Sequence, residues 1–324
     1  MTFEVFREPL YRRYYSTYTS ASFCYALVFG FAVIILPLIL AYNSEGFWYK
    51  EGTYFEQPSI SYRYQSVIEL QGRDSNDNSA FSLYYSTSES LKSHHSGIIR
   101  SPILQSAEFD DDRNGVNDRI EFTMSMPLKP TETISSMNAL IFYDVALQVR
   151  AKVQFDAVAL VNYVSGSGIN NVKIDGDIKL RQTWPLQVKG GMKIPYNDSA
   201  LLPTSLPYGI SETAYSTSHI VEAMAARNLS TTFSQTYAVA EHAFSGSTLT
   251  NDINYFNATI QIRVPEQQVW YTPGVSEVLK WAWIQYVSFF VVVSFLVHRL
   301  SSFVFRHQLL HTYSTADIIT EKMN

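Results

Sequence analysis

Residues 22–42 read SFCYALVFGFAVIILPLILAY, and this run contains no acidic or basic side chain. A helix rises about 1.5 Å per residue and the apolar core of a bilayer is about 30 Å thick, so the run is long enough to span a membrane. A second run, residues 281–297, reads WAWIQYVSFFVVVSFLV near the other end of the chain. Two such spans predict that both ends of the chain lie on one side of a membrane and that the residues between them lie on the other.

Each run has an alternative interpretation. The first could be a cleaved signal peptide, but its apolar core is too long and no clear A-x-A exit follows it. The second is shorter and includes Gln285, Ser288 and Ser294, which the buried helix of a soluble protein also tolerates. The matching basic flanks of the two runs favour two membrane spans.

Basic residues set the predicted orientation. Those near the outer ends of the two runs are Arg7, Arg12, Arg13, Arg299 and Arg306, whereas Lys50 and Lys280 lie near the inner ends. Because Lys and Arg concentrate on the cytoplasmic side of membrane spans, both termini are predicted to be cytosolic. The expected organisation is a cytosolic tail (1–21), a first span (22–42), an extracytosolic domain (43–277), a second span (278–298) and a second cytosolic tail (299–324).

Composition limits the function classes. The chain has 324 residues, of which 46% are hydrophobic and 16% charged, and its net charge is −5. This charge gives no electrostatic support for nucleic-acid binding. The single cysteine, Cys24, lies inside the first span, so the domain between the spans contains no cysteine. We therefore expect that domain to be held together by an ordinary apolar core.

Strand patterns dominate the region between the spans. Apolar and mostly polar residues alternate over 145–155, 122–126 and 258–264, which is typical of strands with one buried face. Over 172–180, Asp175 and Gly176 stand between alternating apolar residues and suggest a tight turn. One short helix is expected at about 219–227, with Ser218 as its N-cap. The predicted fold is mainly β, an antiparallel sandwich-like extracytosolic domain anchored by two transmembrane helices.

The sharpest local motif is residues 110–121, which read DDDRNGVNDRIE. They match the calcium-loop pattern D-x-[DN]-x-[DN]-G-x5-E, with candidate ligands Asp110, Asp112, Asn114, Asp118 and Glu121. An EF-hand needs a helix on each side of this loop, but a strand pattern follows it here. Two interpretations stay open: a calcium loop within a β domain, or an acidic solvated turn between strands.

Other motifs bear on compartment and chemistry. Three N-x-[ST] sequons, at Asn197, Asn228 and Asn257, lie between the spans and are candidate glycosylation sites, although chance gives a similar number in a chain so rich in Asn, Ser and Thr. The sequence contains no zinc-protease, phosphate-loop or dinucleotide motif, and neither span carries a charged residue in its core. We expect no enzymatic activity, no cofactor other than a possible Ca²⁺ ion, and no small-molecule substrate.

Several segments, in order along nearly the whole chain, resemble the transmembrane protein 231 family of the ciliary transition zone. They are Gly46-Phe47-Trp48 with Glu56-Gln57-Pro58, Asp112-Arg113-Asn114, Asp175-Gly176-Asp177 to Leu180, His219-Ile220-Val221 with Arg227-Asn228, Tyr271 with Pro273-Gly274, and residues 282–288 (AWIQYVS). The blocks near the two spans are the most specific.

This resemblance implies a two-pass member of the tectonic-like, or Meckel syndrome, complex, which limits the diffusion of membrane proteins between cilium and plasma membrane. The expected location is therefore the ciliary membrane at the transition zone, and the expected partners are other membrane and cytosolic proteins of that complex together with membrane lipid. The alternative is an accessory subunit of a two-pass channel or transporter with a large extracellular domain. Such ectodomains are usually rich in disulfides, which this chain does not offer.

Overall fold

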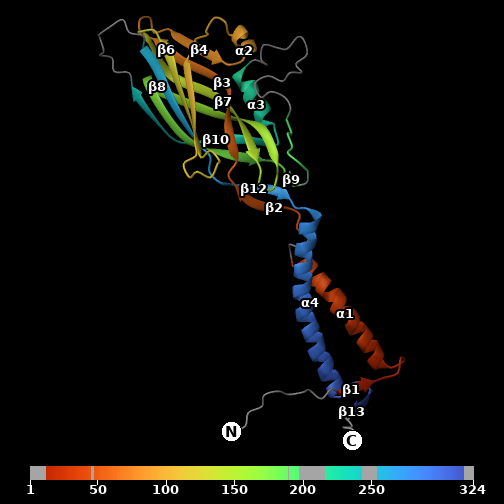
Figure 1. Cartoon of the computed structure of the whole chain (residues 1–324). Coiled ribbons are helices and arrows are strands. Elements are labelled where there is room, and N and C mark those ends of the chain that lie inside the picture. The colour runs from red at the N-terminus through yellow and green to blue at the C-terminus, as the bar shows by residue number, and fades with distance from the viewer. Residues whose placement is uncertain (1–11, 45–46, 189, 197–215, 243–253, 317–324) are drawn as a thin grey trace, which may run out of the picture. The chain divides into compact units, whose positions relative to one another are not determined.

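A computed structural model describes residues 12–44, 47–188, 190–196, 216–242 and 254–316. The chain divides into two compact units (Figure 1). One unit comprises Met1–Lys50 and Pro273–Asn324, and the other comprises Glu51–Thr272.

The first unit contains the two apolar helices, α1 (Ala21–Asn43) and α4 (Val275–Arg306). Both are long and apolar enough to cross a membrane. Helix α1 begins where the Ser20 hydroxyl accepts a hydrogen bond from the Phe23 N–H at 3.3 Å, which satisfies one of the free donors of the first turn. Helix α4 ends at Arg306, whose positive charge suits the negative end of the helix dipole.

The two helices run antiparallel. The rings of Tyr25 and Phe305 lie edge to face with 5.6 Å between their centroids, and the Tyr286 hydroxyl donates to the Ile34 carbonyl at 3.4 Å. Residue numbers therefore rise along α1 as they fall along α4. Beyond the helices, β1 (Arg12–Tyr15) pairs antiparallel with β13 (Tyr313–Ala316), in the register Arg12↔Ala316. The two tails thus meet at the same end of the helix pair.

The second unit is mainly β. Its elements are β2 (Gly52–Glu56), β3 (Ser59–Asp74), β4 (Ala80–Ser86), α2 (Glu89–His94), β5 (Ile103–Phe109), β6 (Arg119–Leu128), β7 (Glu132–Leu147), β8 (Val153–Gln182), β9 (Leu186–Gln187), α3 (Thr217–Ala225), β10 (Leu229–His242), β11 (Asn254–Arg263) and β12 (Gln267–Thr272).

Eight of these strands form one curled sheet, visible in Figure 1. Its main path runs β4-β3-β7-β8-β11-β6-β5, and β10 adds to the second half of β8. Neighbours pair antiparallel except β8 and β11, which are parallel with Ile174 opposite Ile260. A smaller sheet has the order β2-β12-β9.

The main core is formed by the residues that alternate along one face of these strands. In β6, residues Ile120, Phe122, Met124 and Met126 are buried, whereas the residues between them are partly exposed. The matching residues of β11, among them Ile260, belong to the same cluster. Period-two alternation therefore predicted correctly which residues of these strands face the core.

Strand β7 is buried on both faces, because a second core covers its other side. Leu140 and Phe142 pack with Ile220 and Met224 from α3 and with Leu91 of α2. Helix α3 was expected at 219–227 but begins at Thr217. Its N-cap is Ser216, whose hydroxyl accepts a hydrogen bond from the His219 N–H at 3.3 Å. The helix exists because its apolar stripe covers Leu140 and Phe142.

Two sequence expectations within the sheet are wrong. Residues 145–155 do not form one strand: β7 ends at Leu147, and the chain turns over 148–152 before β8 begins. The alternation continues through this turn, but Val149, on the expected apolar face, is 67% exposed. The turn is held by Glu56, whose carboxylate accepts from the Gln148 and Val149 N–H groups at 2.5 and 2.9 Å.

The expected tight turn at Asp175-Gly176 is instead the middle of β8. Asp175 is fully buried and accepts a charged hydrogen bond from Arg263 Nη2 of β11 at 2.9 Å. A Cβ on Gly176 would lie 2.6 Å from the Ser234 carbonyl oxygen of β10 and 2.5 Å from the Phe233 ring. Glycine is present here because β10 approaches closely, which a single sequence does not distinguish from a turn.

The predicted fold class is confirmed. The chain is mainly β with two candidate membrane helices, one near each end. The details that the sequence did not predict are the curling of a single large sheet, its parallel β8–β11 pair, and the pairing of the two tails.

Candidate functional site

The predicted acidic loop joins β5 to β6. Phe109 pairs with Arg119 at its base, and the Asp118 N–H donates to the Phe109 carbonyl at 2.8 Å. Arg113 and Gly115 have φ of 61° and 86°, so the chain turns sharply between the two strands. Because strands flank the loop on both sides, it is not an EF-hand.

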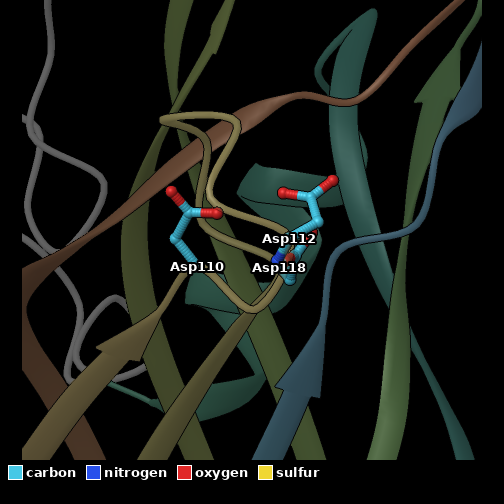
Figure 2. A group of neighbouring side chains, drawn as sticks. All are labelled: Asp110, Asp112 and Asp118. Carbon is cyan, nitrogen blue, oxygen red and sulfur yellow. The ribbon is translucent and has the colours of Figure 1, made fainter.

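The loop brings three of the predicted ligands together. One carboxylate oxygen from each of Asp110, Asp112 and Asp118 lies within 4.8 Å of the other two, and Figure 2 shows these side chains around the loop. Asn114 contacts this group through its N–H, which donates to Asp110 Oδ1 at 3.1 Å and to Asp112 Oδ1 at 3.0 Å, whereas its own Oδ1 accepts from the Val116 N–H at 2.7 Å. Carboxylate oxygens such as those of the three aspartates suit a hard cation such as Ca²⁺.

Glu121 does not join this group. It lies on β6, where one of its carboxylate oxygens is 3.8 Å from Arg119 Nη1. Arg119 also pairs with Asp111 at 2.9 Å and lies 3.9 Å above the Phe109 ring. Glu121 is the last ligand of the sequence pattern, and its carboxylate therefore faces Arg119 rather than the three aspartates.

The carboxylates already accept hydrogen bonds from the loop itself. Asp118 Oδ2 accepts from the N–H groups of Asp111 and Asp112 at 2.7 and 3.2 Å, and its Oδ1 accepts from Gln57 Nε2 at 2.8 Å. Asp110 Oδ2 accepts from the Gly115 N–H at 2.9 Å. The hydrogen bond from Gln57, together with the N–H groups of Asp112 and Asp111, lowers the pKa of Asp118. The residues fit a calcium ion in part, and calcium binding stays a prediction.

The sequons fall in different settings. Asn197 lies outside the described residues. Asn228 is exposed immediately before β10, and its carbonyl accepts from the Thr183 N–H at 2.9 Å. Asn257 is exposed on β11, where its Oδ1 accepts from Ser125 Oγ at 2.7 Å. Glycosylation of these residues stays a prediction.

A cavity of about 640 Å³ lies between α3 and the sheet. Its lining includes Glu69, Asn138 and Glu222, together with Tyr84, on which the His95 ring stacks at 4.0 Å. Burial, aided by the nearby Glu69 carboxylate, raises the pKa of Tyr84 to about 12. No sequence pattern indicated this cavity, because its walls come from four strands and a helix that are far apart in the chain.

Comparison with known proteins places this architecture in a family. The model of the family described as Transmembrane protein 231 matches residues 1–314. Transmembrane protein 231 of Xenopus tropicalis is 28% identical over 312 residues, which are 96% of this chain and 95% of the relative. The human protein of that name is 28% identical over 313 residues, which are 96% of this chain and 94% of the relative.

Among solved structures, the cryo-EM structure of a proton-activated chloride channel covers 88% of this chain and 99% of its own, with 9% identity and a TM-score of 0.27. That score is too low to carry an argument about fold or function. The relatives, by contrast, are matched along almost their entire length and are named as a transmembrane protein. This chain belongs to the transmembrane protein 231 family.

Proposed function

We propose that this chain is a non-enzymatic membrane component of the ciliary transition-zone, or tectonic-like, complex. In this role it helps to form a diffusion barrier for membrane proteins between cilium and plasma membrane, and it supports cilium assembly. The observation that carries the proposal is the family match over residues 1–314, together with relatives that cover 96% of the chain.

The architecture supports this role physically. A lateral barrier needs subunits that are fixed in the bilayer and connected to their neighbours. The antiparallel helices α1 and α4 suit the first requirement, since both are long and apolar enough to span. The β unit suits the second, because a large folded domain outside the bilayer offers surface to neighbouring proteins.

The proposed topology places both termini in the cytosol at the transition-zone membrane. Pairing of β1 with β13 supports the part of this proposal that puts the two tails on one side. The excess of Arg outside the spans supports the cytosolic assignment. The proposed partners are other membrane and cytosolic proteins of the complex and membrane lipid, with no nucleic acid and no small-molecule substrate.

Localisation is the simplest test. A tagged full-length chain expressed in ciliated cells should concentrate in a ring at the base of the cilium. Uniform staining of the plasma membrane would contradict the proposal, and is the result that a channel or transporter subunit would give. A protease-sensitive terminal tag on the cytosolic side of intact vesicles would support the topology, and full protection would overturn it.

A second experiment asks which unit directs localisation. Replacing residues 278–297 with an unrelated apolar helix of equal length keeps the anchor but removes the contacts of its polar side chains, among them Gln285 and Ser288. Weakened localisation would indicate that helix contacts recruit the chain. Unchanged localisation would assign recruitment to the β unit.

A further inference from the structure

The small sheet lies at the end of the β unit where the chain enters and leaves. Strand β2 begins at Gly52 and β12 ends at Thr272, which are the limits of the unit apart from Glu51. The inner face of this sheet holds Val269 and Tyr271, which are buried. The outer face carries Phe55 and Trp270, which alternate with those residues and are exposed.

Neighbouring turns present more apolar side chains at this same end. The β7–β8 turn is fixed on β2, because the Ala151 N–H donates to the Tyr54 hydroxyl at 3.1 Å and Glu56 accepts from the Val149 N–H. Segment 192–194 is fixed in turn on the β7–β8 turn and on β8: the Lys193 N–H donates to the Lys152 carbonyl at 2.9 Å, and the Gln154 N–H of β8 donates to the Lys193 carbonyl at 2.9 Å. Large apolar residues exposed by between 46% and 67% at this end are Phe55, Val149, Trp184, Met192, Ile194 and Trp270. We call these six residues the apolar end.

A group of exposed apolar residues of this size needs an explanation, since soluble surfaces rarely gather so many. Two tryptophans are among them, and tryptophan favours the boundary between lipid and water. Lys152 and Lys193 lie in the same turns, and Lys152 is exposed, so cations stand beside the apolar side chains. Basic residues near a bilayer surface are attracted to anionic headgroups, and exposed Glu51 offsets this attraction only in part.

The covalent chain joins the small sheet directly to a candidate membrane span. Only Pro273 and Gly274 separate β12 from α4, one of the two candidate spans. Consecutive Cα atoms are about 3.8 Å apart, so the two elements cannot be far from each other. We infer that the apolar end is a membrane-docking surface, with its aromatic and aliphatic side chains in the interfacial layer of the bilayer from which α4 emerges. This inference needs α1 and α4 to span a bilayer, and it does not depend on the ciliary role.

Depth-dependent quenching tests the inference on the full-length chain in nanodiscs. Cys24 is the only cysteine, so Cys24→Ser followed by Met192→Cys or Val149→Cys gives single labelling sites for an environment-sensitive NBD dye. The matched control is Val164→Cys, which lies on β8 of the same unit and is 76% exposed. Lipids that carry a nitroxide at the headgroup or high on the acyl chain report contact with the interface.

Dye at residues 192 and 149 should be quenched about twofold by the shallow nitroxides, because interfacial side chains penetrate only a short distance. Dye at residue 164 should be unaffected. Equal quenching at residues 192, 149 and 164 would overturn the inference, as would blue-shifted emission at residues 192 and 149 without quenching, which indicates burial against protein. Ile194→Asp should reduce quenching at residue 149, whereas Val239→Asp, an exposed β10 position, should not. An unchanged signal in Ile194→Asp would contradict docking through this end.

Discussion

Replacing Arg100 with leucine would leave a buried carboxylate without its charge partner. Arg100 precedes β5 and contacts Glu132 at the start of β7 through both terminal guanidinium nitrogens, with Nη2 3.0 Å from Glu132 Oε1. Arg100 Nη1 also donates to the Pro127 carbonyl at 3.1 Å. Glu132 is only 8% exposed and the Arg100 side chain 22%, so this bidentate pair connects the segment before β5 to β7 where water has little access.

Breaking a buried ion pair from one side costs about 3–5 kcal/mol, because the remaining charge is desolvated and unpaired. Without the arginine, Glu132 still accepts a hydrogen bond from the Lys129 N–H at 2.9 Å and lies 3.8 Å from the Lys129 ammonium. We therefore expect Arg100→Leu to lower the free energy of unfolding by about 3 kcal/mol, at the low end of that range. The double variant Arg100→Leu/Glu132→Gln should recover about half of this loss, since it removes the unpaired charge.

The effect should depend on pH. The hydrogen bonds from Arg100, followed by the Lys129 N–H, lower the pKa of Glu132 in the folded chain. A carboxyl with a lowered folded pKa stabilises the fold above its unfolded pKa, about 4.3, and loses that contribution as the pH falls through the folded value. The difference between the parent chain and Arg100→Leu should therefore be full at pH 7 and shrink under acid conditions.

Pulse proteolysis in urea, applied to the full chain in detergent, measures these free energies. Lys92→Leu is the control, because it removes an ion pair with the exposed Glu89 on α2 and should change stability by only a few tenths of a kcal/mol. A loss below about 1 kcal/mol in Arg100→Leu, the value typical of exposed pairs, would refute the buried-pair reasoning. So would a double variant no more stable than the single one.

Three further predictions concern other parts of the chain. Gly176→Ala should destabilise the sheet by about 1–3 kcal/mol in the same assay, whereas Gly166→Ala, on the same strand with open space around it, should cost far less; equal costs would refute the close approach of β10. Millimolar calcium should raise the melting temperature of the chain, and Asp112→Ala should abolish that increase; a parent chain insensitive to calcium would identify the acidic loop as a solvated turn. A glycosidase-sensitive mass shift should disappear when Asn228 and Asn257 are replaced by glutamine together with Asn197, and its absence from the parent chain would contradict an extracytosolic domain.

The sequence predicted the elements whose local pattern specifies one type of secondary structure. Residues 22–42 and 281–297 are long and mostly apolar, which predicts a helix whether that helix is buried in protein or faces lipid, and the structure has α1 and α4 there. The alternation at Phe122 and Met124 likewise has one interpretation, a strand with one buried face. Length and periodicity were sufficient for both.

Prediction from the sequence failed where the conformation of a residue depends on a contact with a segment far away in the chain. The turn over 148–152 is determined by the Glu56 carboxylate and the Tyr54 hydroxyl, both roughly a hundred positions away in the chain, as their hydrogen bonds to Val149 and Ala151 show. A glycine is needed at position 176 because β10 approaches closely there. The apolar residues around it have the same spacing whether the glycine lies in a turn or in a strand. Such tertiary causes leave no local signature.

The acidic loop shows both cases at once. Asp110, Asp112 and Asp118 are close in sequence and lie in one tight loop, so their carboxylates are close together in the structure, while calcium binding by them stays a prediction. The position of Glu121 did not follow, since it belongs to β6, where pairing with β5 and β11 fixes its direction beside Arg119. The sequence motif does not show that β6 begins at Arg119, before Glu121, the last ligand of the motif.

The proposed barrier is tested most directly by fluorescence recovery of a plasma-membrane marker across the ciliary base. Ciliated cells without this chain should retain some cilia but admit the marker after photobleaching of the cilium, and the full-length chain should restore exclusion. The marker must be a membrane protein that normal cilia exclude, so that recovery reports lateral leakage. An intact barrier in cells without the chain, with neighbouring members of the complex assembled normally, would contradict the account.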